Sequence, residues 1–114
     1  MPGMSIHAFD IARGIPAAGM RVAVRGPKDV LLAEGTVSAA GTFDAPALSA
    51  RLAPGRYVVA FHVAEFHRAS GIALPDVPFL DVARWDFGLA DPAQHIHIPF
   101  KFTPWGYSCF RGGA

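Results

Sequence analysis

The sequence has a single cysteine, Cys109, among its 114 residues. One thiol excludes a disulfide within the chain and any metal site built from several cysteines. Charged residues are also scarce, at 17% of the chain, and ten basic residues against nine acidic ones leave a net charge of +1. Binding to nucleic acid by neutralisation of phosphates needs a surplus of Lys and Arg. We therefore expect no nucleic-acid partner.

Long apolar runs are missing as well. No stretch approaches the roughly 20 residues that a membrane-spanning helix needs, so we expect no membrane association. The first seven residues lack the basic start and apolar centre of a signal peptide, which favours a cytoplasmic protein. With 52% hydrophobic residues, the chain does not have the composition of a disordered protein. Its length suits a single domain over residues 1–114.

Short segments in which apolar and other residues alternate predict β-strands, and turn residues separate them. These segments are 20–25, 30–38, 55–64 and 94–102. Only residues 64–70 predict a helix, of two turns at most, and the proline-rich residues 70–84 are interpreted as one long ordered loop. Several short strands at this spacing predict an all-β sandwich or barrel.

Two of the five histidines, His95 and His97, are two residues apart on a predicted strand. Both side chains should point away from the Ile and Phe residues with which they alternate. Three interpretations stay open at this point. The pair could bind zinc with a third ligand such as His7, could act in acid and base catalysis, or could be two half-exposed histidines on a sheet.

The other potentially reactive side chains have less informative surroundings. His62 is interpreted as a structural residue on the second face of the sheet, opposite the apolar face of its strand, and His67 as a solvated or capping residue of the short helix. Cys109 has no neighbouring base, which favours an inert thiol. The sequence contains no glycine-rich phosphate loop and no nucleophile elbow of the Gly-x-Ser-x-Gly type.

Six segments in order resemble one known family over nearly the whole chain. They include Ile-His-Ala-Phe-Asp near the N-terminus, His-Ile-His-Ile-Pro in the last predicted strand, and Pro-Trp-Gly-Tyr-Ser-Cys-Phe-Arg-Gly near the C-terminus; the six segments are 6–10, 14–19, 52–57, 78–82, 95–99 and 104–112. They resemble the transthyretin-like family, and its 5-hydroxyisourate hydrolase branch more than its hormone carriers. The resemblance implies an all-β sandwich of two sheets, with about eight strands and one short helix.

The same resemblance implies a function and a site. Its enzymes open the ring of 5-hydroxyisourate, a urate-type compound of purine breakdown, and form homotetramers with sites between subunits. It implies His7, His97 and Arg111 as catalytic residues, without a metal or cofactor. The residues that we expect to contact the substrate are Thr42, Phe43, His95, Ser108, Phe110 and Gly112.

Three positions depart from the family pattern. Thr42 stands where the family has an arginine after an Asp-Gly turn, Phe110 replaces a tyrosine of the tail, and Gly113 replaces its serine. These changes remove polar or charged groups. They favour a substrate with a less polar ring, such as an N-methylated 5-hydroxyisourate formed by oxidation of methylxanthines such as caffeine. The alternative is a non-catalytic small-molecule binding protein with an apolar channel.

Overall fold

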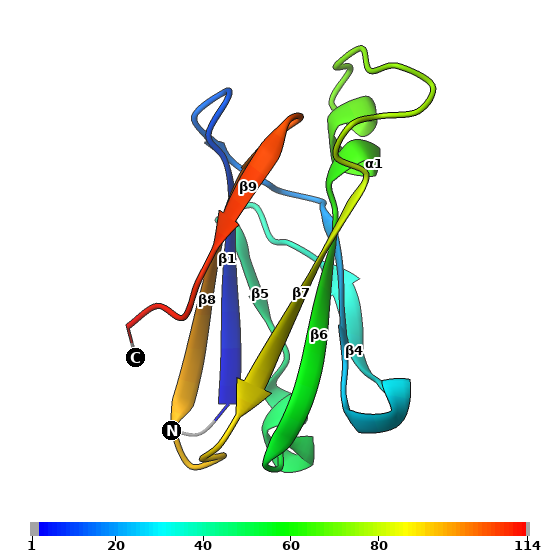
Figure 1. Cartoon of the computed structure of the whole chain (residues 1–114). Helices are drawn as coiled ribbons and strands as arrows, with labels where there is room; N and C mark the ends of the chain where they lie inside the picture. The colour runs from blue at the N-terminus through cyan, green and yellow to red at the C-terminus, as the bar shows by residue number, and fades with distance from the viewer. Residues whose placement is uncertain (1–2, 114) are drawn as a thin grey trace.

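The structure, a computed structural model, describes residues 3–113, except for the side chains of residues 46, 47 and 49. These residues form nine strands, one α-helix and two short 3-10 helices (Figure 1). The strands are β1 (Gly3–Asp10), β2 (Ile15–Pro16), β3 (Arg21–Arg25), β4 (Leu31–Thr36), β5 (Thr42–Asp44), β6 (Gly55–His62), β7 (Val82–Leu89), β8 (His95–Thr103) and β9 (Gly106–Cys109). The helix α1 covers Val63–Ala69, and the 3-10 helices η1 and η2 cover Pro27–Asp29 and Pro46–Arg51.

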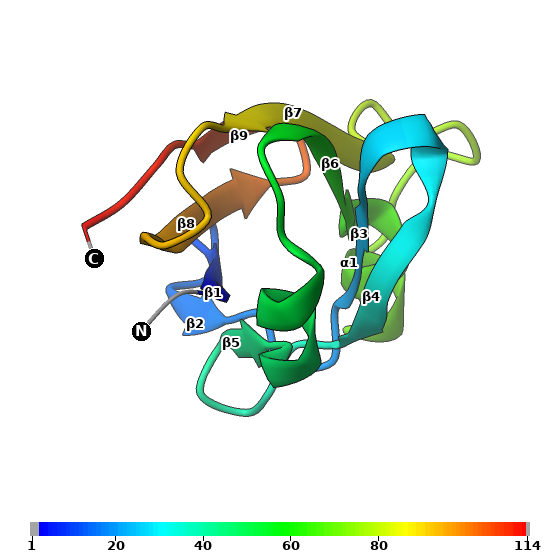
Figure 2. The ribbon, with the colours of Figure 1, turned by 90° about the horizontal axis from the view of Figure 1, so that it is seen from below.

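The nine strands form two sheets that face each other (Figure 2). One sheet has the order β2-β1-β8-β9, with β5 also paired to β1, and the other has the order β4-β3-β6-β7. The predicted two-sheet sandwich with one short helix is confirmed, with nine strands where about eight were expected. No described helix is long and apolar enough to cross a membrane.

Strands β1 and β8 pair in parallel, from Gly3 opposite His95 to Asp10 opposite Phe102. All other strand pairs are antiparallel. A parallel pair joins segments that are distant in the sequence, because a hairpin cannot connect parallel neighbours. This pairing brings the first and last histidine-bearing segments of the chain side by side.

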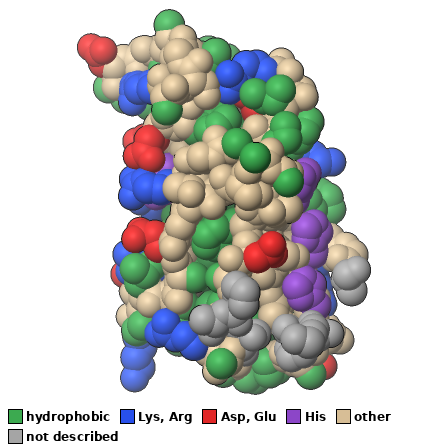
Figure 3. Space-filling model, turned by 180° about the vertical axis from the view of Figure 1, so that it is seen from behind, with side chains coloured by type: hydrophobic (Ala, Val, Ile, Leu, Met, Phe, Trp, Pro, Cys, Tyr) green, Lys and Arg blue, Asp and Glu red, His purple; other side chains and the backbone are tan. Residues whose placement is uncertain are grey.

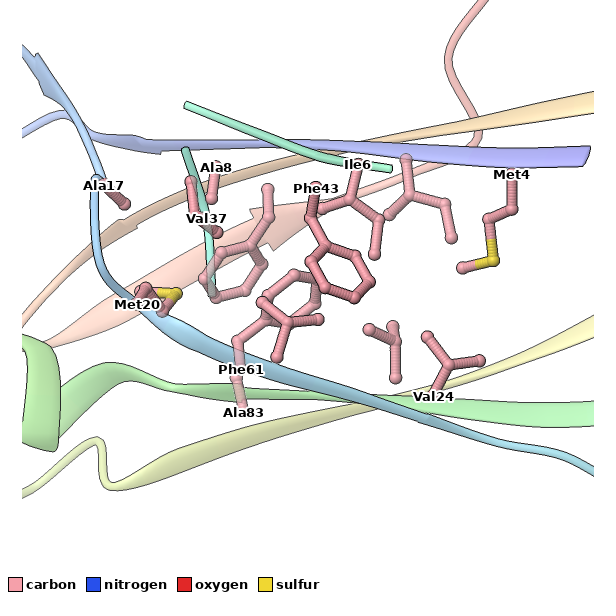
Figure 4. Packing of buried hydrophobic residues seen from close by; sticks show 14 of the residues in the cluster. Met4, Ile6, Ala8, Ala17, Met20, Val24, Val37, Phe43, Phe61 and Ala83 are labelled. Carbon is pink, nitrogen blue, oxygen red and sulfur yellow. The ribbon is translucent and has the colours of Figure 1, made fainter. Parts of the chain in front are cut away.

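Apolar side chains from both sheets fill the space between them (Figure 4). The alternation predicted for residues 94–102 is confirmed, and that for residues 55–64 is confirmed as far as His62, where β6 ends. The buried inward side chains are Tyr57, Val59, Phe61, Ile96, Ile98, Phe100 and Phe102. Val63 and Ala64 were expected on the strand but begin the helix α1, and both are buried. The Phe61 and Phe100 rings stack across the gap with centroids 3.8 Å apart. This stack joins β6 of one sheet to β8 of the other.

The segment before β7 is partly mispredicted. Residues 70–84 were expected to be one loop, but β7 begins at Val82 and pairs along its length with β6. The strands expected at 20–25 and 30–38 are confirmed as β3 and β4, and the helix expected at 64–70 is confirmed as α1.

The prediction for His67 is wrong. Its side chain is 1% exposed and lies on the inner face of α1, one turn after the buried Val63. Residues four apart share one face of a helix. The imidazole packs against the rings of Phe66 and Phe102, and its Nε2 atom lies 3.7 Å from the buried carboxylate of Asp10. No group in the described chain hydrogen-bonds either ring nitrogen.

Burial lowers the pKa of His67, against the opposing charge of Asp10. The folded protein therefore protonates this imidazole only at a lower pH than the unfolded chain, which binds the proton at the ordinary histidine pKa of about 6.5. Unfolding then takes up a proton below this pH, so the stability contributed by neutral His67 is lost as the pH falls.

We expect His67→Phe to reduce this pH dependence. The free energy of unfolding, measured by urea denaturation at pH 7.5 and pH 5.5, should fall less in the variant than in the original chain over this interval. Equal losses in the two proteins would contradict the burial argument.

Candidate functional site

The outer face of the β1–β8 pair carries polar side chains that alternate with buried apolar ones. We call this surface the histidine face and define it by Ser5 and His7 of β1 and His95 and His97 of β8. The four side chains are half-buried, while Ile6 and its apolar counterparts on β8 point into the core. Strand alternation thus places all four groups on one surface, as predicted for the two β8 histidines.

His7 and His97 lie diagonally across the two strands. Ser5 is the register partner of His97, and Pro99 is the register partner of His7. Their Cα atoms are offset by one strand spacing and by two residues along the strand, which corresponds to a distance of roughly 8 Å. Histidine side chains gather in a row along one side of the molecule in Figure 3. A small molecule on this surface could therefore contact both imidazoles.

Ser5 was not among the predicted site residues. Its Oγ atom lies 2.8 Å from Nε2 of His95 and 2.8 Å from Nδ1 of His97. The serine precedes His7 by two residues, so alternation alone would have placed it on the same face. Its contact with the other two histidines follows from the parallel pairing of β1 with β8, which no local pattern reveals.

Strand β5 places Thr42 beside His7, its register partner. The Thr42 hydroxyl is hydrogen-bonded to that of Ser38 at 2.8 Å. The preceding residue, Gly41, has a φ of +88°, and a Cβ atom there would lie 3.1 Å from Nε2 of His7 and 3.1 Å from the carbonyl oxygen of Ala8. Glycine thus allows this turn to lie close to the His7 ring.

The C-terminal tail continues from β9 along the side of β8 that does not pair with β1. The Gly112 amide donates a hydrogen bond to the His97 carbonyl oxygen at 2.7 Å. A Cβ atom at Gly112 would lie 3.0 Å from Cδ2 of His97 and 3.1 Å from Cδ of Pro99. The missing side chain lets the tail lie against His97, so the structure places Gly112 at the histidine face.

Arg111 does not join the histidines within one chain. Its guanidinium donates a hydrogen bond to Oε1 of Gln94 at 2.8 Å, and the residue is exposed. Ser108 pairs with Lys101 farther along the same outer face, and Phe110 is 45% exposed.

The structure contradicts the placing of Phe43 in the binding site. Its side chain is 8% exposed and belongs to the core between the sheets. Residues 42 and 43 are neighbours on β5, and neighbouring side chains of a strand point to opposite faces. Because Thr42 lies beside His7 on the outer face, Phe43 must point inward.

The interpretations of His62 and Cys109 agree with the structure. His62 lies on the outer face of β6, while its neighbour Phe61 points into the core, and the Arg21 guanidinium donates a hydrogen bond to its Nδ1 atom at 3.3 Å. A hollow on that outer face is lined by His62 together with mostly charged side chains, and by none of the residues predicted to bind or transform the substrate. Burial raises the pKa of the Cys109 thiol to about 12, so the thiol stays protonated and is a poor nucleophile.

The described residues contain no group of three or more His, Cys, Asp or Glu side chains arranged to hold a metal. Two ring nitrogens that zinc could use, Nε2 of His95 and Nδ1 of His97, instead face the Ser5 hydroxyl. The chemistry available here is proton transfer by imidazoles and hydrogen bonding by hydroxyls and backbone amides.

Comparisons with known proteins agree on one family. The model of the HIUase/Transthyretin family matches residues 4–112. The 5-hydroxyisourate hydrolase of Deinococcus radiodurans is 40% identical, over 97% of this chain and 96% of its own length. The structure of Klebsiella pneumoniae 5-hydroxyisourate hydrolase matches with a TM-score of 0.80 and 28% identity, over 99% of this chain and all of that one. The crystal structure of (S)-allantoin synthase matches with a TM-score of 0.85 and 25% identity, over 97% of this chain but 43% of that one.

Proposed function

The chain belongs to the HIUase/Transthyretin family, and on this basis we propose that it hydrolyses the ring of a 5-hydroxyisourate-type compound. The observation that carries the proposal is the placement of His7 and His97 on one outer face of paired strands, with the tail residue Gly112 bonded to His97. The relatives named as 5-hydroxyisourate hydrolases support a hydrolase rather than a carrier.

The proposed reaction opens a cyclic amide. One imidazole, His7 or His97, accepts a proton from water while the water oxygen bonds to a ring carbonyl carbon. The carbon–nitrogen bond of the ring then breaks, and the other imidazole gives a proton to the leaving nitrogen. A cation near the developing oxyanion would stabilise it. We assign this role to Arg111, brought to the histidine face in the assembled protein.

We further propose that the substrate carries N-methyl groups. Thr42 places a methyl and a hydroxyl beside His7, and the hydroxyl is already bonded to Ser38. A guanidinium at this position would favour an anionic, oxygen-rich ring, whereas threonine does not. Phe110 adds an exposed aromatic ring near the tail. Both features suit a substrate in which methyl groups replace acidic N–H groups.

A homotetramer is part of the proposal. β9 and β7 are the last strands of their sheets, so each has an edge free to pair with another copy of the chain. The histidine face is an open surface in one chain, and a second copy could enclose it. We keep the cytoplasm as the proposed compartment.

Thr42→Arg should change the substrate preference. We expect kcat/KM for unmethylated 5-hydroxyisourate, relative to the trimethyl analogue, to rise about tenfold or more, because a guanidinium pairs with the acidic ring. The matched control is Thr36→Arg, which adds the same charge on β4 of the other sheet. An unchanged ratio in Thr42→Arg would contradict the assigned role of residue 42.

The function itself is tested by mixing the protein with freshly generated 5-hydroxyisourate and, separately, with its trimethyl analogue. Ultraviolet absorbance follows the loss of each compound against its spontaneous decay. We expect the trimethyl compound to be consumed faster. Saturable binding of either compound without faster decay would instead favour the non-catalytic binding protein.

A further inference from the structure

Ser5 is placed between two imidazoles. It lies on β1, and both imidazoles lie on the neighbouring β8, where His97 is its register partner and His95 is two residues earlier. The serine Oγ atom lies 2.8 Å from Nε2 of His95 and 2.8 Å from Nδ1 of His97. Both distances are those of good hydrogen bonds. One hydroxyl thus connects a ring nitrogen of each histidine.

The chemistry of a hydroxyl restricts how these bonds are made. Serine has one hydrogen to donate and oxygen lone pairs to accept with. If both rings donated to Ser5, its own hydrogen would have no acceptor among the described groups. We therefore expect one ring to donate to the serine while the serine donates to the other.

Two neutral arrangements satisfy this condition. In the first, His95 donates from Nε2 and Ser5 donates to Nδ1 of His97, so His97 carries its proton on Nε2. In the second, His97 donates from Nδ1 and Ser5 donates to Nε2 of His95. In that arrangement Nε2 of His97 has a free lone pair and can act as a base. The proton positions of the two rings are coupled through one serine.

From this geometry we propose that His95, Ser5 and His97 form a proton relay, with Ser5 as its positioning residue. The relay rests on the proposed hydrolysis. As the water oxygen bonds to the ring carbonyl carbon, Nε2 of His97 accepts the water proton. The Nδ1 proton of His97 passes to Ser5, and the serine proton passes to Nε2 of His95.

The step conserves protons and charge. His97 and Ser5 end neutral, and His95 ends as an imidazolium that balances the negative charge formed on the substrate. His7, the other imidazole of the proposed reaction, gives a proton to the leaving nitrogen as the ring opens. Reversal of the relay transfers then releases a proton that replaces the one lost by His7. The relay gives His95 a role in the reaction in addition to contact with the substrate.

The relay is first tested by kinetics. Ser5→Ala removes the hydroxyl, and Ser5→Thr keeps a hydroxyl on a residue suited to a strand. We expect Ser5→Ala to lower kcat about 100-fold, with little change in KM, because proton transfer is lost and substrate contacts remain. Ser5→Thr should restore most of the lost rate. An unchanged kcat in a folded Ser5→Ala variant would overturn the relay.

A proton inventory adds a measurement that a structural role would not affect. In mixtures of H2O and D2O, concerted movement of several protons gives a curved dependence of kcat on deuterium content. We expect curvature in the original chain and in Ser5→Thr, and a straight line in Ser5→Ala. A straight line in the original chain would overturn the proposal.

Nitrogen-15 NMR of the histidine rings tests the coupling without any substrate. At a pH where both rings are neutral, Nε2 of His95 and Nδ1 of His97 should show complementary protonation, and Ser5→Ala should abolish this relation. Independent protonation in the original chain would overturn the relay even if the enzyme is active. If neither 5-hydroxyisourate is hydrolysed, the proposed function fails, and the NMR result alone decides whether the coupled pair exists.

Discussion

His97→Ala should lower the rate of ring opening by about 100-fold or more, because the variant loses an acid or base group at the reacting atoms. Backbone packing should be preserved, since the His97 side chain lies on an outer face and its backbone carbonyl still accepts the Gly112 bond. The same loss is expected for His7→Ala. The measurement is kcat with freshly generated substrate, alongside circular dichroism to show that each variant is folded.

The matched control for both variants is His62→Ala. His62 is also half-buried, but it lies on the other sheet, away from the histidine face. We expect this variant to retain the original rate. Normal turnover in both His7→Ala and His97→Ala would contradict the site, whereas loss in all three variants would point to a general effect of removing a histidine.

Phe61→Ala should have the largest effect on stability. Phe61 is fully buried and stacks on Phe100 of the opposite sheet. Removal of the ring leaves a cavity at the contact between the sheets and should lower the free energy of unfolding by about 3–5 kcal/mol. Urea denaturation at one fixed protein concentration measures the change.

Phe79→Ala makes the same chemical change on the surface. Phe79 is 77% exposed, and its ring centroid lies 6.1 Å from that of Trp105, which is itself exposed. Its loss should cost less than about 1 kcal/mol, because little apolar area leaves water there. Similar losses in the two variants would show that burial of the Phe61 ring against Phe100 contributes no more to stability than an exposed ring does.

The sequence predicted those parts of the fold that depend on local alternation. Strands β6 and β8 were recognised because every second side chain is apolar, and burial in a sandwich requires this pattern. The whole of β7 was missed: no strand was predicted over Val82–Leu89, and Val82 follows a proline-rich stretch that extends to Pro78. Proline and glycine mark irregular backbone, but they do not show where the next strand begins.

The candidate site was predicted only where local alternation along a strand determines it. The outward direction of His95 and His97 follows from alternation along one strand. The bonds to Ser5 depend on which strands are neighbours and in which register, which local sequence does not contain. Burial of His67 beside Asp10 likewise depends on the packing of α1 against the end of β1. The sequence shows only that the side chain is polar, which led to the prediction of a surface position.

The parallel pairing of β1 with β8 has a consequence for synthesis of the chain. The ribosome makes β1 first, but the histidine that pairs with Ser5 is added 92 residues later. Until then, this edge of β1 has no β8 to pair with, and unpaired strand edges of this kind promote aggregation. Chaperone binding to nascent chains should therefore concentrate on β1 and persist until β8 has emerged from the ribosome.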